Sequence, residues 1–408
     1  MHKSTNFTGQ PVFNQLLKLI TRQTVEQLSK NTPGSEAYVK KLDGYKHLVI
    51  MLFAVFNHFD SLREVEIGMQ AEAHKFTHLG LDYMVRRSTL SEANCRRPSA
   101  FFAQVYMLLL KKYAPFLADS RTTKEQKEWE KLLYMMDSTT ISLFDNILKG
   151  VGRNPKTGKK KGGMKVHTLM KYIEGVPMVI DLTSAAKHDH YLLKKVHLPK
   201  DSTLAIDRAY IDYAQFQRFT EEGVCYVTKM KKKLKYSVLS SVIYVNEKGL
   251  VVAKEKKIVF EKGELRHESR KVEIWEENKK ESVVLLTNNF EFSFEDLREI
   301  YRRRWAIETL YKQLKQNFQL HFFYGDSVNA IEIQTWVVLI ANLLLTVIQK
   351  KIKRHCSFSQ IVTMVRQTLM YYIDFVAFME NPNKGWKIIS EEHEKSPPKI
   401  VQYSLNFE

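Results

Sequence analysis

Cysteine is scarce in this chain of 408 residues, which contains only Cys95, Cys225 and Cys356. The three lie far apart and none belongs to a C-x-x-C pair, so we expect neither a disulfide framework nor a cysteine-rich zinc site. This usage of cysteine suits the reducing cytoplasm.

Motifs for nucleotide-driven chemistry and for catalytic triads are also missing. No G-x-x-x-x-G-K segment occurs, so we expect neither an ATP-driven machine nor a nucleotide cofactor. No Ser, His and Asp arrangement stands out for nucleophilic catalysis. The segment His188-Asp189-His190 has no third ligand at a usable spacing, and we interpret it as a loop or a helix cap.

Long apolar runs are few. The segment Met1–Gln10 is polar and lacks the apolar stretch of a signal peptide. The longest uncharged run, Ile333–Gln349, has 17 residues and includes four polar side chains, so we expect a buried core helix rather than a membrane span. With no exposed amphipathic or lipid-anchored segment in view, a role at a membrane surface is disfavoured.

Acidic residues are in deficit, since 63 Lys and Arg face 45 Asp and Glu, which gives a net charge of +18. Such an excess favours a polyanionic partner, and nucleic acid suits it better than a membrane. The hydrophobic content of 44% is ordinary for a folded protein, and the length allows two or three domains.

Residues 1–125 are predicted to be a helical N-terminal DNA-binding domain. A capping box at Thr89 and Glu92 predicts a helix start soon after a turn at Gly80. That helix carries Arg96 and Arg97 and resembles the basic reading helix of a helix-turn-helix, so both arginines are candidate DNA contacts. Two capped helices around a glycine also occur in ordinary helical bundles.

The rest of the chain predicts an α/β core with an insertion. Residues 126–231 have the order strand–strand–strand–helix–strand–helix–strand, which indicates a mixed sheet. Residues 232–282 are short β-branched runs broken by charges, typical of a β-rich insertion. Residues 283–325 complete the core with a strand and a long helix, and residues 326–408 form a helical C-terminal region and tail.

Two aspartates stand in apolar strands. Asp137 lies inside the strand Leu133–Ile141, and Asp207 ends the strand that begins at Thr203. An ionised carboxylate in a core strand is costly unless a cation compensates it, and strand ends are where such sheets bind ligands. Either aspartate alone would also suit a turn or a cap.

The predicted helix from Phe294 to Leu320 carries a polar stripe made of Tyr301, Arg304, Glu308 and Lys315. At 100° per residue these four side chains fall within roughly 60° of one another. Such a stripe is often a solvated face with ion pairs. A carboxylate on the stripe and two strand-borne aspartates would instead supply three oxygen ligands, which suit Mg²⁺ or Mn²⁺ and, with two ions, in-line phosphoryl transfer.

Together, the acidic trio and the stripe resemble the signature of the DDE transposases of bacterial insertion sequences, in the branch with a Tyr-Arg-Glu-Lys motif. The matching residues are Asp137, Asp207 and Glu308, with Tyr301-x2-Arg304-x3-Glu308-x6-Lys315. The resemblance covers nearly the whole chain and implies an α/β ribonuclease-H-like catalytic core with a β-rich insertion, flanked by an all-α N-terminal domain and a helical C-terminal region. The segment Asp207-Arg208-Ala209-Tyr210 resembles the Asp-Arg-Gly-Tyr common in the family, with alanine in place of glycine.

The resemblance also implies roles for single residues. The acidic trio would bind two Mg²⁺ or Mn²⁺ ions. Tyr301, Arg304 and Lys315 would bind phosphates of the transposon end. Lys312, on the same stripe, and Arg208, next to Asp207, are further candidate DNA contacts. Excision in this branch is expected to pass through a DNA hairpin with a flipped base stacked on an aromatic ring. Trp275 is the candidate platform, and core packing is its alternative role.

Two basic segments are further candidates for DNA contact. The segment Lys149–Lys171 contains no acidic residue, is rich in glycine and adjoins Asp137. Its candidate DNA contacts are Lys159, Lys160, Lys161, Lys165 and His167. Because Lys165 and His167 alternate with apolar residues, we expect them to project into the active cleft; a solvated loop is the alternative for the rest. A second cluster, between Lys229 and Lys235, is expected to line the same channel.

The sequence therefore predicts a cut-and-paste transposase that binds terminal inverted repeats, cleaves DNA with divalent metal and joins 3′-OH ends to a target. It is expected to act on transposon ends and target DNA as a homodimer in a synaptic complex, in the bacterial cytoplasm at the nucleoid. The alternatives are a catalytically inactive descendant that only binds DNA and a nuclease of the same fold that cuts without joining.

Overall fold

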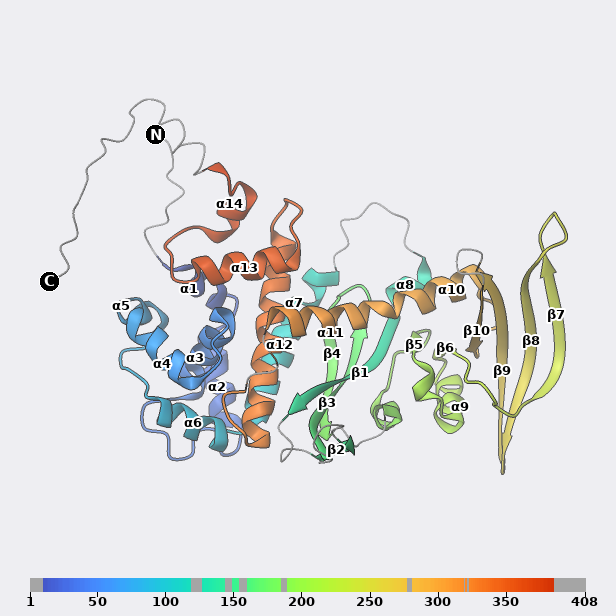
Figure 1. Cartoon of the computed structure of the whole chain (residues 1–408), viewed down its shortest axis with the longest axis horizontal. Coiled ribbons are helices and arrows are strands. Elements are labelled where there is room, and N and C mark those ends of the chain that lie inside the picture. The colour runs from blue at the N-terminus through green and yellow to red at the C-terminus, as the bar shows by residue number, and fades with distance from the viewer. Residues whose placement is uncertain are drawn as a thin grey trace.

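The computed structural model describes most of the chain, namely residues 10–118, 127–143, 149–153, 160–184, 189–276, 281–318, 320 and 323–384. Figure 1 shows helices at one end of the long axis, a sheet in the middle and a twisted set of long strands at the other end. The two ends of the sequence meet in the helical part, and the centre of the sequence supplies the sheet.

The helical part is built around one deeply buried helix. Its N-terminal elements are α1 (Val12–Leu17), α2 (Arg22–Asn31), α3 (Gly44–Asn57), α4 (Leu62–Ala71), α5 (Ala73–Phe76), η1 (Thr77–Leu79), α6 (Arg87–Arg96) and α7 (Ser99–Ala118). Every residue of α3 from Leu48 to Phe56 is buried, because the segment is apolar on all sides. Burial all round requires neighbours on every side of α3.

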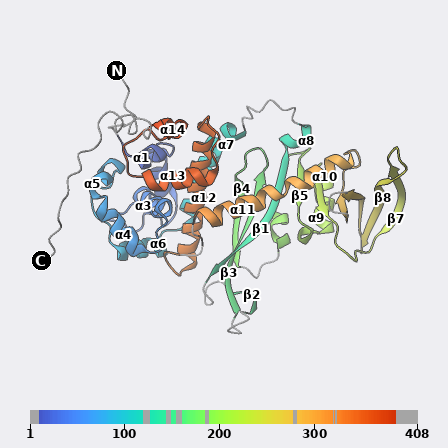
Figure 2. The same ribbon diagram turned by 45° about the horizontal axis from the view of Figure 1, so that its top comes forward.

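Helices from the other end of the chain supply part of that cover. They are α12 (Val328–Lys351), α13 (Phe358–Thr368) and α14 (Phe375–Glu380), and they lie against the N-terminal helices in both views (Figures 1 and 2). Backbone N–H groups of Val12 and Phe13 donate to the carbonyls of Tyr371 (2.9 Å) and Leu369 (2.7 Å). The two ends of the described chain are thus tied together.

Helix α12 is long and apolar enough to cross a bilayer by composition. In the structure 89% of its apolar stretch is buried by the protein itself, against α3 and α7 among other elements. The prediction of a buried core helix over Ile333–Gln349 is therefore confirmed.

One mixed sheet occupies the middle of the molecule. Its strands are β1 (Leu133–Leu143), β2 (Lys149–Arg153), β3 (Lys160–Lys171), β4 (Pro177–Ser184), β5 (Thr203–Ile206), β6 (Cys225–Lys229), β7 (Ser237–Val245), β8 (Val251–Lys262), β9 (Leu265–Glu276) and β10 (Glu281–Thr287). The strand order is β2-β3-β1-β5-β6-β10-β9-β8-β7, with β4 also paired to β3. The pairs β1–β5 and β5–β6 are parallel, and β1–β3 and β3–β4 are antiparallel.

The insertion is continuous with that sheet. Strand β10 pairs with β6 on one side and with β9 on the other, so β7, β8 and β9 extend the same hydrogen-bonded ladder. Strands β7, β8 and β9 lie within the segment 232–282 for which a β-rich insertion was predicted. Strand β2 was not foreseen, because Lys149–Arg153 contains two glycines and a single β-branched residue, Val151.

Short helices and one long pair of helices cover the sheet. They are α8 (Glu128–Lys131), η2 (Asp189–Lys195), η3 (Arg208–Tyr210), α9 (Tyr213–Glu221), α10 (Phe294–Arg303) and α11 (Trp305–Asn317). The single helix predicted over 294–320 is wrong in one detail, since it is broken at Arg304. There the backbone bonds join residues only three apart, Arg304 N to Tyr301 O (3.3 Å) and Ile307 N to Arg304 O (3.2 Å).

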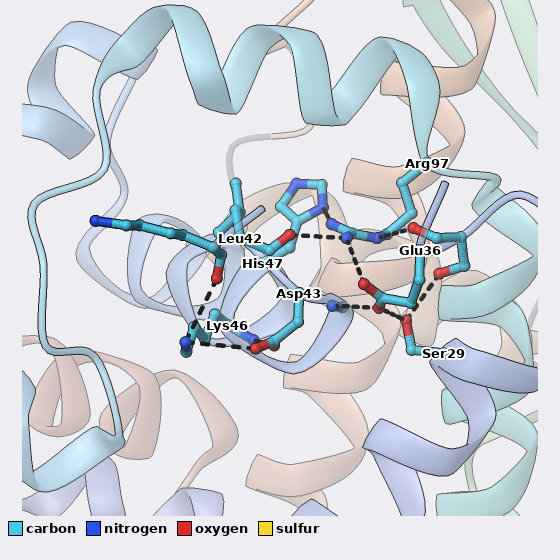
Figure 3. A network of polar contacts seen from close by, with 10 residues as sticks. Ser29, Glu36, Leu42, Asp43, Lys46, His47 and Arg97 are labelled. Atoms are coloured by element: carbon cyan, nitrogen blue, oxygen red, sulfur yellow. Dashed lines mark hydrogen bonds and ion pairs between the residues drawn. The ribbon is translucent and has the colours of Figure 1, made fainter. Parts of the chain in front are cut away.

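A buried polar network holds the N-terminal helices together (Figure 3). The side chain of Arg97 is only 2% exposed. Its guanidinium donates to the carbonyls of Ser35 (3.1 Å) and Leu42 (2.8 Å) and to Nδ1 of His47 (2.9 Å), and it lies 3.7 Å from a carboxylate oxygen of Glu36. All of these partners belong to the first 50 residues, so Arg97 fastens the start of the chain to the end of α6.

The prediction that Arg97 contacts DNA is therefore wrong, because its guanidinium is enclosed and fully engaged. The proposed capping box is wrong too: α6 begins at Arg87, whose N–H donates to Glu66 of α4 (3.3 Å). Arg96 lies on the surface, 3.6 Å from Glu92, and its role in DNA contact stays a prediction.

His47 gives this network a dependence on pH. Burial, and secondly the charge of Arg97, lower the pKa of His47 to about 3. The ordinary value is 6.5, so between pH 6.5 and 3 the unfolded chain binds a proton that the folded chain does not. This contribution to stability is complete above pH 6.5 and is lost as the pH falls, at a rate of up to about 1.4 kcal/mol per pH unit.

We expect the urea midpoint of wild type to fall more steeply between pH 6.5 and 4 than that of His47→Gln. A matched control is His74→Gln, because His74 is on the surface. Its urea midpoint should change with pH as steeply as that of wild type. Equal slopes for wild type and His47→Gln would contradict the assignment. The slopes are compared rather than the absolute stabilities, since the glutamine variant also alters the contacts of Arg97 and Asn94.

Candidate active site

Two aspartates meet on neighbouring parallel strands. Asp137 lies in the middle of β1, and Asp207 directly follows β5. The register sets Met136 beside Ile206, so the next residue on each strand is an aspartate. In-register neighbours in a parallel pair point to the same face and their strands lie about 4.8 Å apart. The sheet therefore brings Asp137 and Asp207 together.

Helix α11 crosses the same face of β1. The hydroxyl of Tyr311 donates to the carbonyl of Asp137 (3.0 Å), and Nζ of Lys315 donates to Oγ1 of Thr139 (2.7 Å). Tyr311 and Lys315 are about one helical turn apart, and they bind residues two apart on the strand. The two bonds therefore fix the position of α11 along β1. They leave Glu308, one turn before Tyr311, at the level of Asp137.

Arg304 lies between the two acidic groups. One nitrogen of its guanidinium is 3.7 Å from Asp137 Oδ2 and another is 2.7 Å from Glu308 Oε1. The side chain of Arg304 is 6% exposed, those of Asp137 and Glu308 are 19% and 35% exposed, so the carboxylates remain open to solvent. The helix is broken at the same residue. The predicted grouping of the stripe residues with Asp137 is seen in the structure.

The pKa of Asp137 records the same convergence. Burial is the main reason why the pKa of Asp137 is raised to about 6. The charges of Glu308 and Asp207 also raise this pKa, whereas the hydrogen bond from the Ser138 N–H and the charge of Arg304 lower it. Burial likewise raises the pKa of Tyr301, with Asp207 adding to the rise. The charges of Glu308 and Asp207 therefore disfavour the ionised form of Asp137, and the positive charge of Arg304 offsets this effect only in part.

The donor set suits a hard divalent cation. Its members are carboxylates. A bound cation would offset both the burial, which is the main cause of the raised pKa of Asp137, and the smaller repulsion from Glu308 and Asp207. As the side chains stand, no three His, Cys, Asp or Glu in the described part of the chain are close enough to hold a metal ion. Glu308 is turned to Arg304 instead, so it would have to leave that partner to complete the set.

A cavity of about 900 Å³ opens beside this group. It lies between the insertion and the α10–α11 helices, and its lining includes Trp275, Trp305, Tyr301, Arg304 and Arg298. The two indoles are 48% and 57% exposed, which leaves large aromatic surfaces facing solvent. Trp275 is therefore not a core residue, and the alternative that it serves core packing is wrong.

Two predicted cleft residues lie on the other face of the sheet. In an antiparallel pair, opposite residues point to one face. Asp137 is opposite Thr168, whereas His167 is opposite Ser138 and is fully buried. Lys165, two residues from His167, shares that far face. The prediction that Lys165 and His167 project into the cleft is wrong, because alternation shows which residues share a face but not which face meets the site.

The remaining predicted contacts lie as follows. Lys312 is exposed on α11 and Arg208 is exposed in η3, next to Asp207. Lys160 and Lys161 belong to β3, with side chains outside the described part, and Lys159 lies outside the described residues. In the Asp207–Tyr210 segment the N–H of Ala209 donates to the carboxylate of Asp207 (3.4 Å). The turn therefore forms with alanine at the position where the family commonly has glycine.

Tyr311 and Trp305 are parts of the site that sequence reasoning missed. Tyr311 anchors α11 on β1, and it lies one turn after Glu308 on the buried side of the helix. Trp305 lies beside Arg304, with the guanidinium 5.4 Å from its ring. A large aromatic residue next to the stripe was the available signal for Trp305; for Tyr311 the signal would have been its i,i+3 spacing from Glu308.

Comparisons with known proteins match the region that builds this site. A family described as "Transposase DDE domain" matches residues 128–344, and a domain of unknown function (DUF4372) matches residues 8–82. The transposase-like protein y4zB of Sinorhizobium fredii is 26% identical over 263 residues, 63% of this chain and 70% of its own length. The probable transposase of insertion sequence element IS5377 from Geobacillus stearothermophilus is 24% identical over 241 residues, 59% of this chain and 63% of its own.

Two further comparisons concern one more sequence relative and one solved structure. A transposase-like protein of insertion sequence element IS4SA from Synechocystis is 24% identical over 261 residues, 63% of this chain and 70% of its own length. Among solved structures, the piggyBac transposase synaptic complex with hairpin DNA aligns over 98% of this chain and 85% of that chain, with 10% identity and a TM-score of 0.41.

Proposed function

The chain belongs to the DDE transposase family, and we propose that it is the cut-and-paste enzyme of an insertion sequence. As a DDE transposase it is an enzyme, a nuclease and strand transferase with a ribonuclease-H-like core. In the proposal it binds terminal inverted repeats, cleaves them and joins their 3′-OH ends to a target. The observation that carries the proposal is the position of Asp137 and Glu308 on either side of Arg304, with Asp207 following the strand that pairs with that of Asp137.

Asp137, Asp207 and Glu308 are proposed to hold Mg²⁺ or Mn²⁺, on which DDE transposases typically depend. When bound, two such ions would activate the attacking oxygen and stabilise the leaving oxygen of an in-line displacement. The chain's own part is to fix the two aspartates by strand register and the glutamate by the anchoring of α11. Asp137 must be ionised for this, and partial compensation by Arg304 favours its ionised form.

The cations of the stripe are proposed to grip backbone phosphates beside the carboxylates. Arg304 is able to donate two parallel hydrogen bonds to phosphate oxygens, and Lys315 offers a compact charge at the edge of the site. Tyr301, Lys312 and Arg208 would add to the same contact. Because Arg304 now bonds Glu308, an incoming phosphate would take over the guanidinium and release the carboxylate.

The cavity beside the site suits an unstacked nucleotide. Its walls combine exposed indoles with arginines, which is the combination that binds single-stranded DNA by stacking and charge. We place the flipped base of a hairpin intermediate there, with Trp275 as its stacking platform. This is the finer proposal, and it assigns the chain to the Tyr-Arg-Glu-Lys branch.

Other surfaces are proposed to bind DNA away from the chemistry. Arg96 in the N-terminal helical domain (1–125) and the basic segment Lys149–Lys171, with Lys159, Lys160 and Lys161, would contact the backbone at the transposon end or the target. Two ends must be cut together, so a homodimer in a synaptic complex follows, in the bacterial cytoplasm at the nucleoid.

A strand-transfer assay tests the proposal. End DNA from the repeats flanking the reading frame, carrying a free 3′-OH, is incubated with target plasmid and Mg²⁺. We expect joined product with this DNA and none with a matched 3′-dideoxy end, because the hydroxyl is the nucleophile. Cleavage without joining would indicate the nuclease alternative, and DNA binding without either would indicate the inactive descendant.

A further inference from the structure

Strand β7 leaves one edge of the sheet open. It is the last strand in the order and pairs with β8 on one side, and no strand in the described part of the chain pairs with its other side (Figure 1). Such an edge presents a row of unpaired backbone N–H and C=O groups, which is a template for another strand. Soluble proteins usually protect long edges with charges, prolines or covering segments.

The sequence of β7 provides none of the usual charged or proline protection. Ser237–Val245 reads SVLSSVIYV, with no charged residue and no proline in nine positions. The neighbouring β8 by contrast carries Lys254, Glu255, Lys256 and Lys257 in a row. In a chain with a net charge of +18, β7 is an edge strand that places no charge of its own at a contact between two copies.

The apolar side chains of β7 are exposed on both faces. Val238, Leu239, Val242, Ile243 and Val245 are each between 48% and 59% exposed. A strand at a sheet edge normally buries one face and exposes the other, so β7 has more apolar surface in solvent than folding of one chain requires. A bulge at Leu239 adds twist but leaves Ser240–Tyr244 in continuous register with β8.

We propose that the β7 edge is a self-association surface, which pairs antiparallel with β7 of a second copy about a two-fold axis near Ser241. An isologous contact requires a self-complementary strand. With Ser241 against itself, Val238 lies opposite Tyr244 and the bulge residue Leu239 lies level with Ile243, while Ser240 lies opposite Val242. Two of these three kinds of pair join large apolar or aromatic side chains. The two sheets then continue as one.

The expected dimer is weak. A nine-residue strand is about 30 Å long, and one such pairing buries less than the roughly 1,600 Å² of a standard interface. We therefore expect a dissociation constant on the order of 10 µM for the protein without DNA. The biological need for two copies rests on the proposed function, whereas the surface rests on β7 alone.

Analytical ultracentrifugation of the DNA-free full chain tests the affinity. We expect Ile243→Lys, which sets a charge from each copy at the contact, to weaken the dimer at least tenfold. Leu250→Lys is the matched control, since Leu250 is 61% exposed just outside β7 and should leave dimerisation unchanged. Unaltered thermal melting of both variants shows that they fold. A monomeric wild type at 100 µM, or equal dimerisation of both variants, overturns the proposal.

Disulfide trapping tests the register. In a Cys95→Ser background, Ser241→Cys places two sulfurs across the axis, where facing Cα atoms are about 4.5–5.5 Å apart and a disulfide is allowed. Ser237→Cys is the control, because its copies would lie eight residues out of register. Preferential cross-linking at position 241 supports the pairing, and equal cross-linking at both positions contradicts it. Since trapping needs no DNA, strand transfer by a chain that fails this test would leave the proposed function standing.

Discussion

Replacement of Glu308 by Gln is expected to lower metal-dependent DNA cleavage by at least about 1,000-fold and to spare DNA binding. The substitution keeps the shape of the side chain and removes the charge that a divalent cation requires. The 2.7 Å ion pair with Arg304 becomes a hydrogen bond from the charged guanidinium to a neutral amide oxygen, so the fold should persist. Cleavage is measured by nicking of labelled end DNA in Mg²⁺, and binding by gel shift.

Glu299→Gln is the matched control for this experiment. Glu299 is also a helical glutamate paired with arginines at 2.7–2.9 Å, namely Arg302 and Arg303, but it stands on α10 outside the acidic group. Its variant should cleave at close to the wild-type rate. Measurable Mg²⁺-dependent nicking by Glu308→Gln, or an equal loss in Glu299→Gln, would remove Glu308 from the site.

The second large effect is on stability. Arg97→Leu is expected to lower the free energy of unfolding of the helical part by about 3–5 kcal/mol, the cost of removing one partner from a buried ionic network. The loss removes the donor to the Ser35 and Leu42 carbonyls and to His47 Nδ1, and it leaves Glu36 without its cation. The first transition in urea denaturation, followed by circular dichroism, measures it.

Arg96 provides the comparison, because it is the adjacent arginine but lies on the surface with one 3.6 Å ion pair. Arg96→Leu should cost no more than about 1 kcal/mol. If Arg96 contacts DNA as proposed, this variant should weaken DNA binding at unchanged stability. Similar destabilisation by both variants would mean that the Arg97 network is not what holds the helices.

The acidic group was the part of the site most accessible from the sequence. Asp137 and Asp207 interrupt apolar strands, where only a functional demand or a compensating charge keeps a carboxylate, and Glu308 falls at a helical spacing from Arg304. Strand patterns also gave most of the sheet. What brings the aspartates together is the β1–β5 register, which no local pattern contains.

The wrong predictions share one physical cause. In each case the position of the side chain depends on contacts with residues that are distant in the sequence. Arg97 was taken for a surface residue because arginine usually is one, and its burial depends on carbonyls of Ser35 and Leu42 more than 50 residues away. His167 alternates correctly with apolar neighbours, yet the face it occupies is decided by where α11 packs.

The paired edges of β10 have a mechanical consequence for the whole enzyme. Because β6, β10 and β9 form one ladder, the insertion that carries Trp275 is joined by main-chain hydrogen bonds to the sheet that carries Asp137. Four strand widths separate β1 from β9, about 19 Å in the hydrogen-bonding direction at 4.8 Å each. If DNA contacts both the indole and the carboxylates as proposed, it has to span that distance along the sheet.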